Sequence, residues 1–173
     1  MTDVVIGTPP NVPPVDYLAR TRERYDSIGF APYRWATEDP LTELAPAPDS
    51  RPLAEMRVGL IGSGGVYVVG QKAYHFKDDI SFREIPAAVP RDDLRLTHFA
   101  YDLTDGRRDP EVVFPLGALH ALAAAGEIGS VADAAYSFVG GIYSARKVRE
   151  QLAPALVQRA IDEHWDMALL VPV

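Results

Sequence analysis

Short apolar runs, separated by glycines or by amphipathic segments, recur along the chain from residue 56 onward. Each run has the length of one strand and is too short for a buried helix. Alternation is clearest in the second run, where Leu94, Leu96 and His98 fall on one side of an extended chain. Four β-strands are therefore predicted, at residues 56–61, 94–101, 134–139 and 167–173.

Helical patterns fill the intervals between the later strands. Pro115 suits a helix start, Gly126 a helix end and Ser144 an N-cap. Pro154 cannot take part in a continuous α-helix, so we expect the helical stretch to break there. The predicted helices span residues 115–125, 144–152 and 154–164.

Strands that alternate with helices predict a three-layer α/β fold with a mainly parallel sheet, because parallel strands need helical crossovers. Ligands bind such sheets beyond the carboxyl ends of the strands, which directs attention to residues 63–66, 98–102 and 138–141. The last strand, residues 167–173, is nearly all apolar, as in a sheet buried on both faces. A domain rarely ends on such a strand, so we expect the fold to be incomplete at its C-terminal end.

The first 55 residues differ from this core. Prolines recur in them, and one helix is predicted from Asp16 to about Ser27. Tyr33 and Trp35 suggest that the Pro-rich part packs on the core as a strap. We therefore divide the chain into an N-terminal arm, helix and strap (1–55) and an α/β core domain (56–173).

Composition argues against several classes of function. Of the 173 residues, 47% are hydrophobic, which suffices for one domain with a buried core. The formal net charge of −7 argues against nucleic-acid binding, which needs a basic surface. No apolar run approaches the ~20 residues of a membrane span, and the N-terminus lacks a signal-peptide pattern. The absence of cysteine excludes disulfides and thiolate metal sites within the chain. By elimination we expect a cytoplasmic protein that binds neither nucleic acid nor membrane.

A glycine turn, Gly-Ser-Gly-Gly, follows the first strand at residues 62–65. It lacks the glycine that a dinucleotide loop needs at position 67, where Tyr67 stands, and no Gly-Lys-Ser/Thr is present. The turn still offers backbone N–H groups that could hold a carboxylate or a phosphate. Ser63, Gly64 and Gly65 are therefore candidate substrate contacts, and a purely structural turn is the alternative.

Two other side chains are candidates for chemistry. His98, near the end of the second strand, could act as an acid or a base, or could be a structural histidine. Arg83 could bind a substrate carboxylate with both guanidinium nitrogens, or could instead pair with Glu84 or a neighbouring loop. A polar group in the loop at residues 75–79 shows no convergence of ligands, so no metal is expected.

Several segments match one family in order and spacing. They are MRVGLIGSGGV (56–66), SFREIP (81–86), THFAYD (97–102), DPEVVFP (109–115) and DMALLVPV (166–173). Together they resemble the glycine/sarcosine/betaine/D-proline reductase selenoprotein B family, and in particular its short, D-proline-reductase-like members. The match covers essentially the whole chain.

This resemblance implies a reductase that cleaves a C–N or related C–X bond in a small carboxylate-bearing molecule. In the family, a selenocysteine or cysteine comes directly after the strand that residues 166–173 resemble. Its selenol or thiol attacks the substrate, displaces an amine or similar group, and is reset by a dithiol reductant. The implied partners are therefore a small-molecule substrate and a dithiol reductant.

No cofactor is expected within these residues, and the redox-active selenocysteine or cysteine is expected beyond Val173. One explanation is a UGA selenocysteine codon read as a stop, in which case residues 1–173 alone should be inactive. A second is a naturally short chain that works with a thiol from a partner. A third is a non-catalytic subunit or small-ligand-binding domain. We also expect a homo-oligomer, in which a copy covers an exposed apolar sheet edge.

Overall fold

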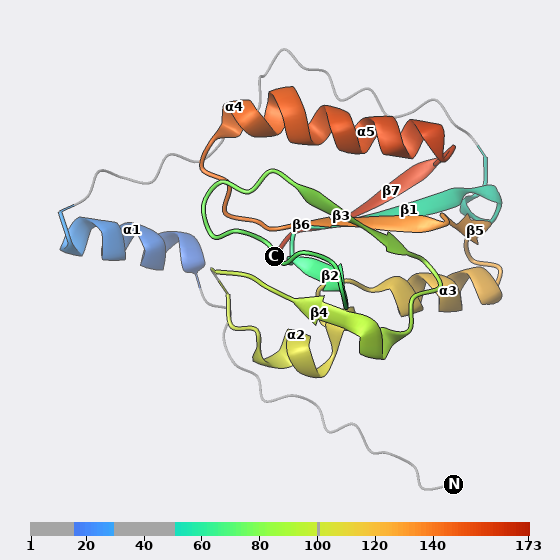
Figure 1. Ribbon diagram of the computed structural model, residues 1–173, viewed down its shortest axis with the longest axis horizontal. Helices are drawn as coiled ribbons and strands as arrows, with labels where there is room; N and C mark the ends of the chain where they lie inside the picture. Colours follow the sequence, from blue (N-terminus) through green and yellow to red (C-terminus); the bar gives the residue numbers. More distant parts are fainter. Residues whose placement is uncertain (1–15, 30–50, 100) are drawn as a thin grey trace, which may run out of the picture. The chain divides into compact units, whose positions relative to one another are not determined.

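The structure is a computed structural model that describes residues 16–29, 51–99 and 101–173 (Figure 1). The chain forms two compact units, Met1–Leu44 and Ala45–Val173, and each is described by itself. The predicted arm and most of the predicted strap lie outside the described residues. The predicted division at residue 55 stays a prediction.

Helix α1 (Tyr17–Ser27), in the first unit, confirms the predicted N-terminal helix. The Asp16 carboxylate caps it by accepting a hydrogen bond from the Ala19 N–H at 2.9 Å. Gly29 lies two residues beyond the helix with φ of +71°, a conformation that glycine adopts without strain.

The second unit is built on a five-stranded sheet. Its strands are β1 (Arg57–Gly62), β3 (Phe82–Pro86), β5 (Ser130–Val131), β6 (Ala134–Phe138) and β7 (Met167–Val171). β5 and β6 pair with one edge of β1 and β7 pairs with the other, all in parallel. β3 pairs antiparallel with β6. The mainly parallel sheet confirms the predicted α/β fold.

The second predicted strand is corrected by the structure. β4 (Leu94–Leu96) has three residues and pairs antiparallel with β2 (Val66–Val68) in a separate two-stranded sheet. The predicted alternation of apolar and polar positions is present in β4, because Leu94 and Leu96 are buried and Arg95 is exposed. Its partner is a strand that the sequence did not single out, so the segment is not part of the parallel sheet.

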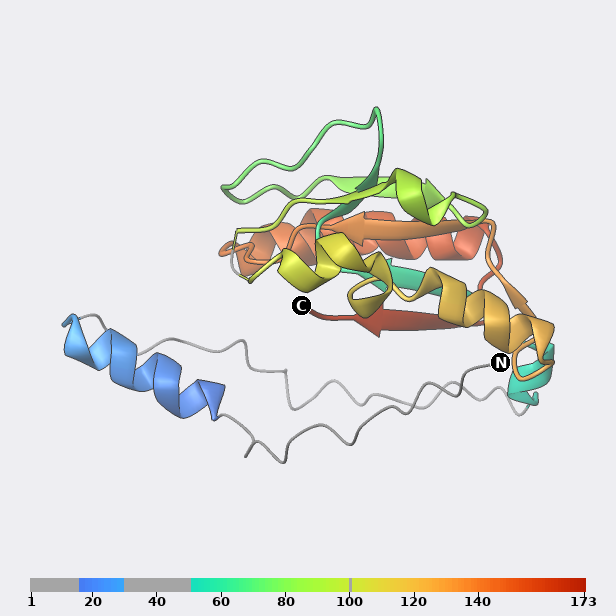
Figure 2. The same ribbon diagram turned by 90° about the horizontal axis from the view of Figure 1, so that it is seen from below.

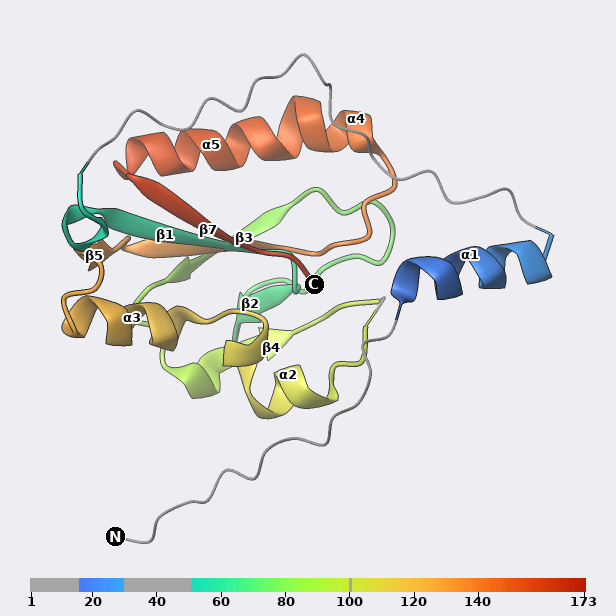
Figure 3. The ribbon, with the colours of Figure 1, turned by 180° about the vertical axis from the view of Figure 1, so that it is seen from behind.

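Helices cover both faces of the main sheet, which gives three layers (Figure 3). One outer layer contains α4 (Ala145–Lys147), η4 (Val148–Leu152) and α5 (Ala153–Asp162). The other contains α2 (Thr104–Arg108), α3 (Leu116–Ala124) and the β2–β4 sheet. Short 3-10 turns are η1 (Leu53–Glu55), η2 (Arg91–Asp93) and η3 (Pro110–Val112). No helix in the described part of the chain is long and apolar enough to cross a membrane.

The helix does not break at Pro154 as predicted. The helical path continues through this proline, and the turn before it, η4, is a π-helix. Proline lacks the N–H that would bond to the carbonyl four residues earlier, and a widened turn accommodates that loss. Ser144 caps the start as predicted, since its hydroxyl accepts from the Lys147 N–H at 3.3 Å.

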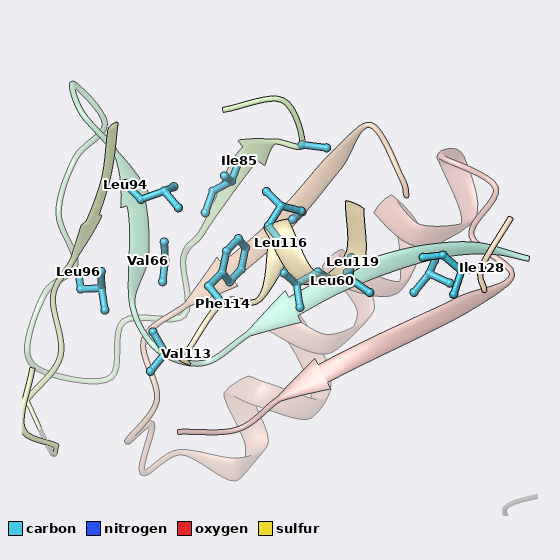
Figure 4. Packing of buried hydrophobic residues seen from close by; sticks show 13 residues of the cluster. Leu60, Val66, Ile85, Leu94, Leu96, Val113, Phe114, Leu116, Leu119 and Ile128 are labelled. Atoms are coloured by element: carbon cyan, nitrogen blue, oxygen red, sulfur yellow. The ribbon is translucent and has the colours of Figure 1, made fainter. Parts of the chain in front are cut away.

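The larger apolar core lies between the sheet and the layer of α3, β2 and β4 (Figure 4). Four of its side chains have no exposed surface: Leu60, Val66, Ile85 and Phe114. Burial of one such side chain contributes about 1.5–3 kcal/mol to stability. A smaller cluster under α5 contains Tyr136, Leu152 and Leu156.

β7 differs from the prediction that it is buried on both faces. It is the outer strand beyond β1 (Figure 2), and Met167, Leu169 and Leu170 are 44%, 37% and 65% exposed. Its apolar sequence indicated burial, and Val171 does pack against the larger core, but the described residues leave the other side chains of β7 exposed. An apolar groove of about 730 Å³ lies between β7 and the α5 layer, with Ser63 and Pro172 at its margin.

We expect Gly65→Ala to destabilise the protein strongly. Gly65 has φ of +70°, and a β-carbon there would lie 1.9 Å from the Thr97 carbonyl oxygen. Gly126 provides the control, because its φ is +76° but no atom lies within 4 Å of its β-carbon position. The control should lose about 1–2 kcal/mol from backbone strain alone. In urea unfolding, Gly65→Ala should lose at least ~2 kcal/mol more than Gly126→Ala. Equal losses would contradict the close approach.

Candidate active site

The carboxyl ends of three parallel strands meet at one edge of the main sheet. β1 leads into Ser63, β6 into Val139 and β7 into Pro172. The loop after β4 brings His98 to the same edge. This is the position at which open α/β sheets bind ligands. The structure thus assembles the predicted candidates Ser63 to Gly65 and His98 in one place.

Ser63 joins the three strand ends. Its N–H donates to the Val171 carbonyl at 3.0 Å, and its own carbonyl accepts from the Gly140 N–H at 2.8 Å. Its hydroxyl oxygen accepts a hydrogen bond from the Val173 N–H at 2.9 Å. Because a hydroxyl that accepts one bond keeps its own proton, Ser63 can still donate to a further group. These contacts fix where the chain leaves β7.

His98 lies against this junction and is 7% exposed. A β-carbon placed on Gly140 would lie 3.1 Å from His98 Nε2, 3.4 Å from the Ser63 carbonyl oxygen and 3.5 Å from the Val173 carbonyl oxygen. The missing side chain at Gly140 therefore lets the imidazole approach the end of β7. The sequence placed residues 138–141 at this edge but gave Gly140 no role.

Burial lowers the pKa of His98 below its ordinary value. The neutral imidazole is therefore favoured near pH 7, and it carries one N–H donor and one acceptor nitrogen. Asp102 does not serve as its carboxylate partner in the described contacts. The Asp102 side chain instead accepts from the N–H and hydroxyl of Thr104 at the start of α2, and these bonds lower the pKa of its carboxyl.

Tyr101 is a residue of this site that sequence reasoning missed. Its ring lies beside the His98 ring, and its hydroxyl bonds to the glycine turn. The only available signal was its place in the segment THFAYD, three residues after the histidine.

Two of the three N–H groups of Ser63, Gly64 and Gly65 already donate hydrogen bonds within the fold. The Ser63 and Gly65 N–H groups donate to the carbonyls of Val171 and Phe138, both at 3.0 Å. An anion would therefore meet at most the Gly64 N–H and the Ser63 hydroxyl in this conformation. Substrate contact by Ser63, Gly64 and Gly65 stays a prediction.

Arg83, on β3, is held by the loop that precedes this strand. Its guanidinium donates to the Lys72 carbonyl at 2.7 Å and to the Ser81 hydroxyl at 2.9 Å, and it lies 4.4 Å above the Tyr74 ring. These contacts fit the structural alternative of pairing with a neighbouring loop. They explain Arg83 without a ligand, so its carboxylate-binding role stays a prediction.

A small cleft of about 100 Å³ opens beside Gly140. Its walls come from the loop at 75–79, from Phe99, and from the loop at 139–143 that follows β6. The described residues contain no group of three or more histidines and carboxylates that could hold a metal ion.

Comparison with known proteins identifies the family. Residues 32–171 match the model of glycine/sarcosine/betaine reductase selenoprotein B (GRDB). The chain belongs to this family. It is also 30% identical over 123 residues to D-proline reductase subunit gamma of Acetoanaerobium sticklandii, a match that covers 71% of the chain and 51% of that relative. The chain thus spans about half the length of the curated relative. No solved structure matches it.

Membership of the selenoprotein B family confirms the resemblance found in the sequence, and with it a role in a reductase family. The relative is a subunit by name, which agrees with a protein that works with other components. The matched region includes the glycine turn, His98 and β7, so the edge described above belongs to the family's own domain.

We expect His98 to make this selenoprotein B family member less stable in acid. Its pKa is lowered in the folded state, so the unfolded chain binds the proton first as the pH falls below about 6.5. The stability from a neutral buried His98 is complete above that pH and is lost below it. His98→Gln removes the titrating group, so urea unfolding should show a smaller loss between pH 7.5 and 5.5 than in the wild type. Equal losses in the two proteins would contradict this assignment.

Proposed function

We propose that this chain forms the front part of a selenol- or thiol-dependent reductase that cleaves a C–N or related C–X bond in a small carboxylate-bearing molecule. The redox-active residue is the one that directly follows Val173. The observation that carries this proposal is the junction at which Ser63 binds the Val173 N–H, with His98 Nε2 and the Val173 carbonyl oxygen both within 3.5 Å of the β-carbon position of Gly140. Family membership supports the reductase class.

The proposed reaction has two halves. In the first, a selenolate or thiolate attacks the substrate carbon, the C–N bond breaks, and a C–Se or C–S bond forms. The amine leaves with a proton. In the second, one thiol of a dithiol attacks the selenium or sulfur, and the carbon fragment leaves with the bonding electrons and takes up a proton. The other thiol then closes the disulfide, so the dithiol supplies both electrons.

The residues of the edge have separate roles in this proposal. His98 gives or takes the proton at the leaving group, because its buried imidazole carries both a donor and an acceptor. The cleft beside Gly140 has room for a small substrate at the end of β7. The Ser63 hydroxyl and the Gly64 N–H are the remaining candidates for a substrate carboxylate, with Gly65 shaping the turn.

We expect the coding DNA to carry an in-frame TGA or a cysteine codon directly after the Val173 codon. The protein extended through the frame that follows should consume D-proline, glycine, sarcosine or betaine when dithiothreitol is supplied, as measured by the ring-opened amino acid from D-proline and by the released amine from the other three. Replacement of the redox residue by serine should reduce this rate about a thousandfold or more, because serine is not an effective nucleophile at neutral pH. A TAA or TAG codon without a further open frame would overturn the position of the redox residue.

The second candidate is a non-catalytic subunit, or a ligand-binding domain that works with a partner chain. The observation that favours it is the exposed apolar strand β7, whose outer edge has no strand partner among the described residues and suits pairing with another chain. An interface of ~1,000 Å² or more would give a stable complex. A homodimer through β7 is the simplest form of this candidate.

This candidate predicts that residues 1–173 sediment as a dimer in analytical ultracentrifugation. Leu170→Glu, on β7, should dissociate the dimer because it places a carboxylate in the contact. Val112→Glu is the matched control, since Val112 is similarly exposed at 58% but lies on η3. A monomer at all protein concentrations, or equal effects of the two variants, would count against the homodimer.

A further inference from the structure

We propose that Tyr101 is a positioning residue that holds the His98 imidazole against the end of β7. Neither the sequence nor the comparisons assign a role to this tyrosine. The inference rests on the proposed function in one respect, that His98 takes part in proton transfer. The position of His98 itself can be tested without any activity.

The Tyr101 ring forms one wall of the His98 site. The two ring centroids are 4.5 Å apart, and the planes are tilted by 48°. On another side, Nε2 of His98 lies 3.1 Å from the β-carbon position of Gly140. The imidazole is thus confined between an aromatic ring and a backbone without a side chain, and these neighbours leave little freedom for the ring to turn.

The Tyr101 hydroxyl connects this ring to the edge of the main sheet that forms the candidate site. It donates a hydrogen bond to the Gly64 carbonyl oxygen at 3.0 Å. Gly64 belongs to the turn whose Ser63 holds Val173, so this bond, together with the bond from the Thr97 N–H to the Gly65 carbonyl at 2.9 Å, connects the His98 loop to the strand junction. Gly106 of α2 also approaches, because a β-carbon there would lie 3.9 Å from the Tyr101 hydroxyl. Tyr101 therefore sets the distance between His98 and the end of β7.

A phenylalanine at position 101 distinguishes the contribution of the aromatic ring from that of the hydroxyl. Tyr101→Phe keeps the ring beside His98 but removes the bond to Gly64. The loop should then open more often, water should reach the imidazole, and the burial that lowers the pKa of His98 should be relieved. We expect the pKa of His98 to rise toward its ordinary value. Tyr67→Phe makes the same chemical change at a half-buried tyrosine of β2 that lies outside the cleft, and it should leave His98 unaffected.

The experiment is an NMR titration of the histidine ring signals in the 173-residue chain and in both variants. In the wild type, nuclear Overhauser contacts should join the His98 and Tyr101 rings. An unchanged His98 titration in folded Tyr101→Phe, or the absence of these contacts in the wild type, would overturn the proposal. The wild-type contacts keep it testable even if a variant fails to fold.

Kinetics of the extended protein then separate this inference from the proposed function. Tyr101→Phe should lower kcat about tenfold with little change in KM, because a misplaced proton-transfer group slows chemistry more than binding. Tyr67→Phe should stay within about twofold. If His98 shifts in the titration but the extended wild type has no reductase activity, the positioning stands and the proposed function fails. If activity is present and Tyr101→Phe retains full kcat, the positioning role in the reaction fails.

Discussion

The three hydrogen bonds of Ser63 are the contact on which this edge of the protein depends. Regular hydrogen bonding holds parallel strands side by side, but it does not hold their ends together beyond the last paired residues. Ser63 holds these ends together, because its N–H and hydroxyl bind the end of β7 and the residues just after it, and its carbonyl binds the segment after β6. A side chain without a hydroxyl could keep the two backbone bonds, but it would release the N–H of Val173.

The second constraint is close packing of backbone on backbone around the same residue. Gly65 passes so near Thr97 that a β-carbon cannot fit, and Gly140 leaves only enough room for the His98 ring. These two approaches bring the loop after β4 onto the main sheet, although β4 belongs to a different sheet. His98 becomes buried as a result, and its altered proton affinity follows from the way the two sheets meet.

The sequence predicted what local pattern can determine. Apolar runs that end in glycine identified β1 and β6, and the Ser144 cap and the apolar pattern identified the helices around them. Prediction from the sequence failed where the fold depends on which strand pairs with which. The segment at Leu94 alternates like a core strand, but its partner is β2, which is only three residues long and gives too little periodicity to be recognised.

For the site, the sequence could place residues at the sheet edge but could not tell which of their groups were already used. Arg83, on β3, shows the difficulty, because a guanidinium has the same sequence signal whether it binds a substrate or the carbonyls of a neighbouring loop. Tyr101 shows the reverse, since its role depends on one hydrogen bond to a carbonyl 37 residues away in the sequence. Backbone N–H and C=O groups leave no trace in composition or spacing.

β7 combines an exposed apolar surface with the proposed reactive position. Its apolar residues would suit a strand covered on both sides, and a strand with exposed leucines at an open edge is an aggregation hazard unless something covers it. The same strand ends at the junction held by Ser63, with His98 beside it. Whatever covers β7 must therefore also lie close to the proposed reactive position. An added segment of chain or a partner subunit at this edge would both bury the leucines and limit access of water to the imidazole, so stability and chemistry at this edge are expected to change together.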